Sequence, residues 1–154
     1  MYKYNNYTIN IIKVMVKTTI FSLFHYNKFI FGQQVVSQFV LFECKYLFSI
    51  ICFYFHKSNG EQDRFHTHAF NAISFKIFGT YNEYVLDDEI TGNYHIEKRT
   101  DIIKYFPRDR YHKIGNSSGC LTLLLSGPWI NSWKEYICGT NKIVNYKFGR
   151  VVFK

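Results

Sequence analysis

Short segments of apolar, β-branched and aromatic residues alternate with polar turns along most of this chain. The segments are four to nine residues long and one residue in five is aromatic, a composition and spacing that favour strands over helices. The clearest turn is Ser58–Asp63, with Asn59-Gly60 at its centre. Further turns are expected at Gly79-Thr80 and at 87–93. The predicted strands are Phe39–Lys45, Phe48–His56, a strand carrying His66 and His68, Asn71–Phe78, Tyr81–Leu86, Tyr94–Lys98, Asp101–Phe106, Tyr111–Ile114, Leu121–Ser126 and Lys142–Phe148. With 154 residues, this pattern predicts one all-β domain, a sandwich or a barrel.

The N-terminal part of the chain fits this pattern less well. Residues 1–32 contain apolar runs that are compatible with either a helix or an edge strand. We expect residues 1–33 to form an extension that packs on or beside a main domain of residues 34–154. Residues 34–55 are apolar, but Glu43 and Lys45 interrupt them, and a membrane-spanning helix needs about 20 largely apolar residues. We therefore predict short strands here and no transmembrane span.

Net charge is +8 and unevenly distributed. Glu43 is the first acidic residue, and the lysines before it are Lys3, Lys13, Lys17 and Lys28. A basic segment can bind nucleic acid or anionic membranes. Because these lysines are scattered and no arginine precedes Arg64, we expect non-specific electrostatics and no specific nucleic-acid site.

The cysteine pattern bears on the compartment. Four cysteines are present, without a CxxC pair or regular spacing: Cys44, Cys52, Cys120 and Cys138. This favours reduced thiols over a disulfide framework. We therefore expect an intracellular, cytoplasmic protein.

Two histidines stand two residues apart in a strand-like context. In an extended strand, His66 and His68 project to the same face, roughly 6.5 Å apart, while Thr67 faces the other way. His112 follows about forty residues later, at the end of the segment that begins with Phe106-Pro107. Imidazoles that converge in this way are suited to binding a divalent transition metal.

The spacing of these residues resembles the paired motifs of the cupin family. The first family motif is HxH, then three or four residues, a glutamate, six residues and a glycine; His66, His68 and Gly79 match it. The second is PxGxxH followed by an asparagine four residues later; Pro107, His112 and Asn116 match it, while Asp109 replaces the glycine.

A closer resemblance is to uncharacterised cupin-like proteins of bacteria and phages that carry HDHPW(D/N)F, GGYxE, HRI and GP…W in this order. The resemblance extends over about residues 38–148. The matching segments here are His66-Thr67-His68-Ala69-Phe70-Asn71, Gly79-Thr80-Tyr81-Asn82-Glu83, His112-Lys113-Ile114 and Gly127-Pro128…Trp133. The resemblance implies a small jelly-roll, or double-stranded β-helix, with an N-terminal extension.

The chain departs from the family at the glutamate that usually joins the histidines. The corresponding position is Ala72, whose methyl group cannot bind a metal. Two alternatives follow: His66, His68 and His112 bind the metal alone, or Glu83 on a neighbouring strand supplies the carboxylate. Glu83 could instead accept a hydrogen bond from a metal-binding histidine.

Other residues of the motifs have weaker chemical assignments. Tyr81 is a candidate acid but also a natural core residue, and Arg110 could clamp an anionic substrate or belong to a charged edge strand. Asn71 could orient a ligand or cap a turn. Glu83, Tyr81 and Arg110 are therefore the catalytic candidates.

The resemblance implies a metal-binding cupin-like protein, with a non-haem Fe(II) oxygenase acting on a small molecule as the leading activity. Fe(II) is the favoured metal, with Zn, Ni or Mn as alternatives. A non-catalytic binding or structural protein and a sugar isomerase or epimerase are the rival functions. A small-molecule ligand is the expected partner, and a homodimer is one option for the assembly.

Overall fold

The computed structural model describes residues 21–137, 140, 142–147 and 150–152, and within them every regular element is a strand. The strands are β1 (Phe21–Phe31), β2 (Gln34–Cys44), β3 (Phe48–Phe55), β4 (Ser58–Glu61), β5 (Arg64–His66), β6 (Ala72–Phe78), β7 (Asn82–Leu86), β8 (Tyr94–Lys98), β9 (Ile103–Phe106), β10 (His112–Ser117), β11 (Cys120–Ser126), β12 (Ser132–Ile137), β13 (Lys142–Lys147) and β14 (Arg150–Val152). The predicted all-β class is confirmed.

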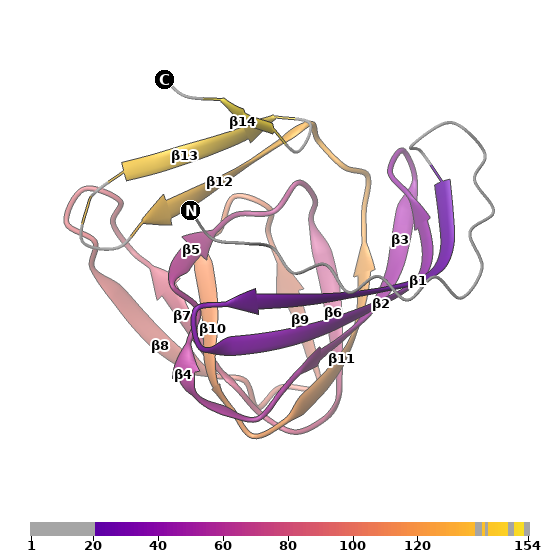
Figure 1. Ribbon diagram of the computed structural model, residues 1–154, viewed down its shortest axis with the longest axis horizontal. Helices are drawn as coiled ribbons and strands as arrows, with labels where there is room; N and C mark the ends of the chain where they lie inside the picture. The colour runs from indigo at the N-terminus through magenta and orange to yellow at the C-terminus, as the bar shows by residue number, and fades with distance from the viewer. Residues whose placement is uncertain (1–20, 138–139, 141, 148–149, 153–154) are drawn as a thin grey trace.

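The strands form two antiparallel sheets (Figure 1). The six-stranded sheet has the order β1-β2-β3-β11-β6-β9, and the larger sheet has the order β14-β13-β12-β5-β10-β7-β8, with β4 also paired to β10. Four nested pairs alternate between the sheets: β7 with β8 and β5 with β10 lie in the larger sheet, and β6 with β9 and β3 with β11 lie in the six-stranded sheet. A long hairpin rolled up so that successive pairs alternate between two sheets is a jelly-roll. The predicted jelly-roll is therefore confirmed by the strand order itself.

Alternation along the strands places one side chain in two between the sheets. Val40, Ile51, Ala72, Phe106 and Leu124 of the six-stranded sheet are all buried and form one core cluster. A second buried cluster includes Phe55, Tyr81 and Ile114.

The N-terminal extension contributes a strand to the fold. β1 runs antiparallel to β2 along nearly its whole length and forms one edge of the six-stranded sheet. Residues 21–31 thus adopt the edge-strand alternative, while residues 1–20 lie outside the described part. The boundary between extension and domain at residue 33 stays a prediction. No helix of the described residues is long and apolar enough to cross a membrane.

Two local predictions differ from the structure, and β12 and β14 have no predicted counterpart. The expected turn at Ser58–Asp63 is wrong, because Ser58–Glu61 is β4 and pairs with β10, where Gly115 lets the two backbones approach closely. The strand expected to carry both His66 and His68 ends at His66. The strand β12 was not predicted at all; it pairs with β5 and supports it from the side opposite β10.

Candidate metal centre

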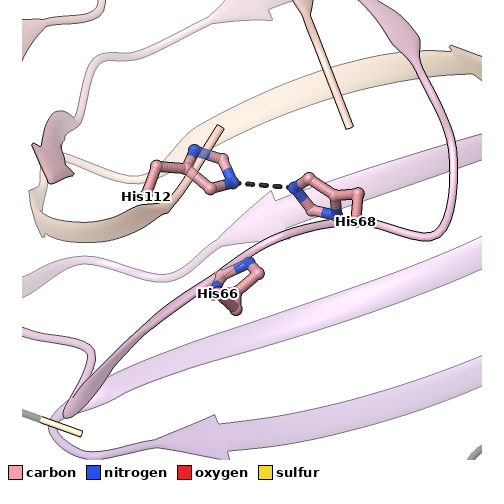
Figure 2. Close-up of side chains that lie close together, drawn as sticks. All are labelled: His66, His68 and His112. Carbon is pink, nitrogen blue, oxygen red and sulfur yellow. Dashed lines mark hydrogen bonds between the residues drawn. The ribbon is translucent and has the colours of Figure 1, made fainter. Parts of the chain in front are cut away.

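Three histidines converge on the inner side of the larger sheet. One ring nitrogen from each of His66, His68 and His112 lies within 4.8 Å of the other two, and the ring centroids are 4.9 to 5.1 Å apart. The Nε2 atoms of His68 and His112 are 2.7 Å apart (Figure 2). Three imidazoles whose ring nitrogens lie this close together could form a ligand set for a divalent transition metal. The structure therefore brings together the three histidines that the sequence indicates.

Pairing of the strands explains how residues so distant in the sequence meet. His112 is the first residue of β10 and lies opposite His66 of β5. His68 follows β5, where the chain stays extended because Thr67 is held by β12: the Thr67 N–H donates to the Lys134 carbonyl, and the Thr67 hydroxyl accepts from the Lys134 N–H at 2.8 Å. Thr67 thus faces away from the imidazoles, as expected.

A second set of bonds fixes the position of His68. Its backbone N–H donates to the carbonyl of Arg108 at 2.9 Å, and the Arg108 N–H donates to the side-chain oxygen of Asn71 at 2.8 Å. Of the two roles considered for Asn71, the structure shows the turn cap. This cap connects the loop before β10 to the segment that carries His68, so the two halves of the candidate site are held together.

The wall around the imidazoles is mainly aromatic. Phe70 stacks on His68 with ring centroids 5.4 Å apart, and Phe106 lies 5.4 Å from His112. Trp129 covers Phe70 at 4.9 Å. Ala72, the position at which the cupin motif has glutamate, is buried in the same cluster as Phe70 and Phe106. Where the family motif would place a carboxylate ligand, this chain therefore has an apolar cluster.

Burial changes the protonation of two of the histidines. Desolvation, together with the nearby His112, lowers the pKa of His66 to about 3 and the pKa of His68 well below its usual value. Both imidazoles are therefore neutral at physiological pH. A neutral imidazole has one ring nitrogen with a free lone pair, which is the form that binds metals.

Glu83 lies behind His112, on the side away from His68. Its side chain is fully buried, and its Oε1 atom is 2.9 Å from Nδ1 of His112. An ionised carboxylate only accepts hydrogen bonds, so Nδ1 of His112 carries a proton. In the neutral form of this ring, the lone pair is then on Nε2, the atom that faces His68. Burial acts to raise the pKa of Glu83, but the hydrogen bonds and charges of His112 and Lys104 outweigh it and hold that pKa at about 2. Glu83 therefore stays ionised.

A chain of charged side chains continues from Glu83 to the surface. Lys104 Nζ lies 2.6 Å from carboxylate oxygens of both Glu83 and Glu97. Glu97 in turn accepts from Arg110 at 2.7 Å and contacts the exposed His95 at 3.1 Å. Two cations thus lie between the two carboxylates, and they compensate a buried negative charge that would otherwise be costly.

The other residues of the motifs lie in packed or hydrogen-bonded positions. Tyr81 is buried in the second core cluster and packs on Phe55 at 5.0 Å. Arg110 Nε is 3.7 Å from Glu83, in addition to the Arg110 contact with Glu97. Asn116 has a positive φ of 49° and donates to the Tyr84 hydroxyl. Gly79 has a φ of +78°, and an added Cβ would lie 2.0 Å from the Gly119 carbonyl oxygen, which explains why this chain has glycine there.

Two residues of the six-stranded sheet support the site without having been predicted from the sequence. Lys104 and Phe106 are two residues apart on β9, so both point inward, one to Glu83 and one to His112. The two-residue spacing of Lys104 and Phe106 indicates that both side chains lie on one face of the strand. A lysine in a short strand, however, usually faces solvent. Its role becomes visible only once β9 is placed opposite β7.

Comparisons with known proteins give no closer identification. No protein-family model matches the chain, and no curated protein sequence matches it. Among solved structures, the oxalate decarboxylase of Bacillus subtilis at pH 4.6 is similar with a TM-score of 0.47 and 16% identity over 68% of this chain and 27% of that one. A structure on the substrate binding mode of oxalate decarboxylase gives a TM-score of 0.49 and 14% identity over 79% of this chain and 30% of that one. This chain spans less than a third of either protein, and the jelly-roll assignment rests on the strand order alone.

Proposed function

We propose that this chain is a metal-binding, cupin-like protein of the kind indicated by its four sequence segments, and that His66, His68 and His112 bind one divalent transition metal. The observation that carries the proposal is the convergence of the three ring nitrogens within 4.8 Å on the inner side of a jelly-roll. Residues from two separated segments meet there in a mainly apolar surrounding, as expected for a small-molecule site. Three protein ligands leave open coordination positions.

Glu83 is proposed to orient His112 rather than to bind the metal. Both of its carboxylate oxygens already have partners, one at His112 Nδ1 and one at Lys104 Nζ. A carboxylate that accepts from the far nitrogen of a metal-binding histidine fixes its tautomer and ring orientation and raises its basicity. Ala72 adds no ligand, so the proposed protein ligand set consists of three imidazoles.

The activity that we propose is that of a non-haem oxygenase using Fe(II). Zn, Ni and Mn are alternative ions for the binding site itself. When bound, such a metal would supply open positions for a small substrate and O₂. Phe70, Phe106 and Ala72 would pack against the substrate and restrict water.

The site fits the two rival functions, a binding protein and a sugar isomerase, to different degrees. A jelly-roll that binds a ligand without turnover is favoured by one observation, the replacement of the usual carboxylate by Ala72 in an apolar cluster. A sugar isomerase needs an unpaired acid/base group, whereas the carboxylates of Glu83 and Glu97 are both paired with Lys104. We therefore rank isomerisation below the other two.

Metal analysis of protein purified without chelators tests the proposal. We expect close to one transition-metal ion per chain, and loss of the ion in His66→Ala/His68→Ala. Oxygen consumption with a panel of small carboxylic acids then separates the oxygenase from a binding protein, since only the oxygenase consumes O₂ with the metal bound. A wild-type protein that contains and accepts no metal would rule out the proposed site.

A further inference from the structure

The larger sheet continues past the three histidines through β12 and β13, and side chains of these strands extend the site. Glu135 of β12 is the cross-strand partner of His66. Cross-strand partners in an antiparallel sheet point to the same side, with Cβ atoms about 4.5–5.5 Å apart. Glu135 therefore stands on the inner side of the sheet, beside a proposed metal ligand.

Trp133 occupies the corresponding position beside His68. The register of β5 and β12 continues to Thr67 and Lys134, which are joined by two hydrogen bonds. The next pair in this register is His68 with Trp133. Trp133 is two residues from Glu135 on β12 and so points to the same side, where it packs against the first core cluster. Because Trp133 is only half-buried, part of its indole remains accessible to a ligand.

The indole of Trp133 is held in place by Tyr146 of β13. The two rings stack with centroids 5.0 Å apart and an interplanar angle of 3°. The Tyr146 hydroxyl donates to Glu135 at 2.8 Å, and Glu135 also accepts from Arg64 at 2.9 Å. These bonds anchor the tyrosine ring, so the orientation of the indole is set before a ligand arrives.

We propose that Trp133 is the platform on which the ring of a planar aromatic ligand packs beside the metal centre. This inference rests on the proposed function, whose substrate class it names. Aromatic side chains border the imidazoles elsewhere as well, since Phe70 and Phe106 each lie 5.4 Å from a histidine ring. An aromatic ring gains more from such neighbours than its buried area provides, because ring pairs favour offset and edge-to-face contacts.

A sugar is the less suitable ligand for this platform. Sugar rings also pack on tryptophan, but each of their buried hydroxyls needs a hydrogen-bond partner. The polar side chains next to Trp133 are already bonded to one another, since Arg64 and Tyr146 both donate to Glu135. An aromatic ring needs no such partners, so these contacts favour it.

The affinities for benzoate and cyclohexanecarboxylate test the proposal. The two anions share the carboxylate and the number of carbon atoms, and only benzoate has an aromatic ring. We expect benzoate to bind ~2–10-fold more tightly, the range that aromatic pairs contribute beyond buried area. Both dissociation constants are measured by NMR titration, followed through the backbone amide signals of the full chain.

Substitutions at position 133 separate recognition of the ring from a purely structural role. Trp133→Leu should abolish the preference for benzoate, whereas Trp133→Phe keeps a ring and should retain part of it. Tyr94→Leu is the matched control and should keep the full preference, because Tyr94 is 48% exposed and packs on Phe65, on the outer side of the same sheet. The ratio of the two dissociation constants does not depend on the folded fraction, so a variant that is only destabilised keeps the wild-type ratio.

Equal affinities for the two anions, no binding of benzoate at millimolar concentration, or a preference that survives Trp133→Leu would overturn the proposal. The titrations are made on metal-stripped and on Zn(II)-loaded protein. An aromatic preference in a protein that takes up no metal would contradict the metal centre and leave the recognition of the ring standing. A metal-binding protein without the preference would contradict only the role of Trp133.

Discussion

Glu83→Gln tests the proposed link between the buried carboxylate and the metal site. The substitution keeps the shape of the side chain but removes its charge. Glu83 is fully buried and accepts from His112 at 2.9 Å and from Lys104 at 2.6 Å. A neutral amide has a single acceptor oxygen and cannot serve both donors as an ionised carboxylate does.

The expected loss has two separate parts. Loss of the hydrogen-bonded partner of a metal-binding histidine typically costs 10–100-fold in metal affinity, or ~1.4–2.7 kcal/mol. Breaking a buried charge pair on one side costs about 3 kcal/mol of stability, although Glu97 still pairs with Lys104 and reduces this. In a chain of this size that corresponds to a fall in Tm of roughly 6–12 °C. Calorimetric titration of metal-stripped protein measures the first part, and thermal unfolding without metal measures the second.

Glu135→Gln is a matched control for this experiment. Glu135 lies opposite His66 in the strand register, but its carboxylate contacts Arg64 at 2.9 Å and Tyr146 at 2.8 Å. The metal affinity of the Glu135→Gln protein should stay within ~3-fold of wild type, because the substitution touches no proposed ligand. If Glu83→Gln lowers the Tm as predicted but leaves metal affinity within that range, Glu83 acts only on stability and our account of its role is refuted.

Three further predictions follow from single positions. Ala72→Glu should lower the Tm of metal-free protein by several degrees, because it buries a carboxylate among apolar side chains. Added metal should then raise the Tm of this variant by more than it raises that of wild type. An equal rise in both proteins would show that position 72 does not face the metal. Gly79→Ala should destabilise the fold by ~2 kcal/mol or more in denaturant unfolding, whereas Gly127→Ala, whose added Cβ would have ordinary contacts, should not; similar losses would contradict the strain at Gly79. NMR titration should find the pKa of His95 above its usual ~6.5, first because of its bond to Glu97. The small stabilisation by His95 is then present below that pH and lost as pH rises through the raised pKa, and Glu97→Gln should bring the pKa down; an unchanged value would remove Glu97 as the cause.

The sequence predicts the class of fold and the three histidines well, for identifiable reasons. Strand alternation and turn residues are local signals, so β6, β7, β8 and β11 lie close to their expected ranges. The prediction for His66 and His68 assumed one continuous strand. The strand ends at His66, yet the two imidazoles still converge because Thr67 is bound to β12.

The features that escaped prediction depend on contacts between distant segments. Ser58–Glu61 has the composition of a turn and becomes a strand only because β10 offers a partner. Glu83 could have been a ligand or a hydrogen-bond partner, and its contact with Lys104 across the two sheets favours the second role.

Titration of metal-stripped protein with Zn(II), followed through the histidine ring resonances by NMR, tests the central claim most directly. The proposed site predicts that the resonances of His66, His68 and His112 shift together and stop shifting at one ion per chain. The described histidines outside the site, His25, His56 and His95, serve as controls in the same sample and should not move. A titration in which the three site histidines stay unchanged, or in which the control histidines take up the metal instead, would contradict the proposed metal centre.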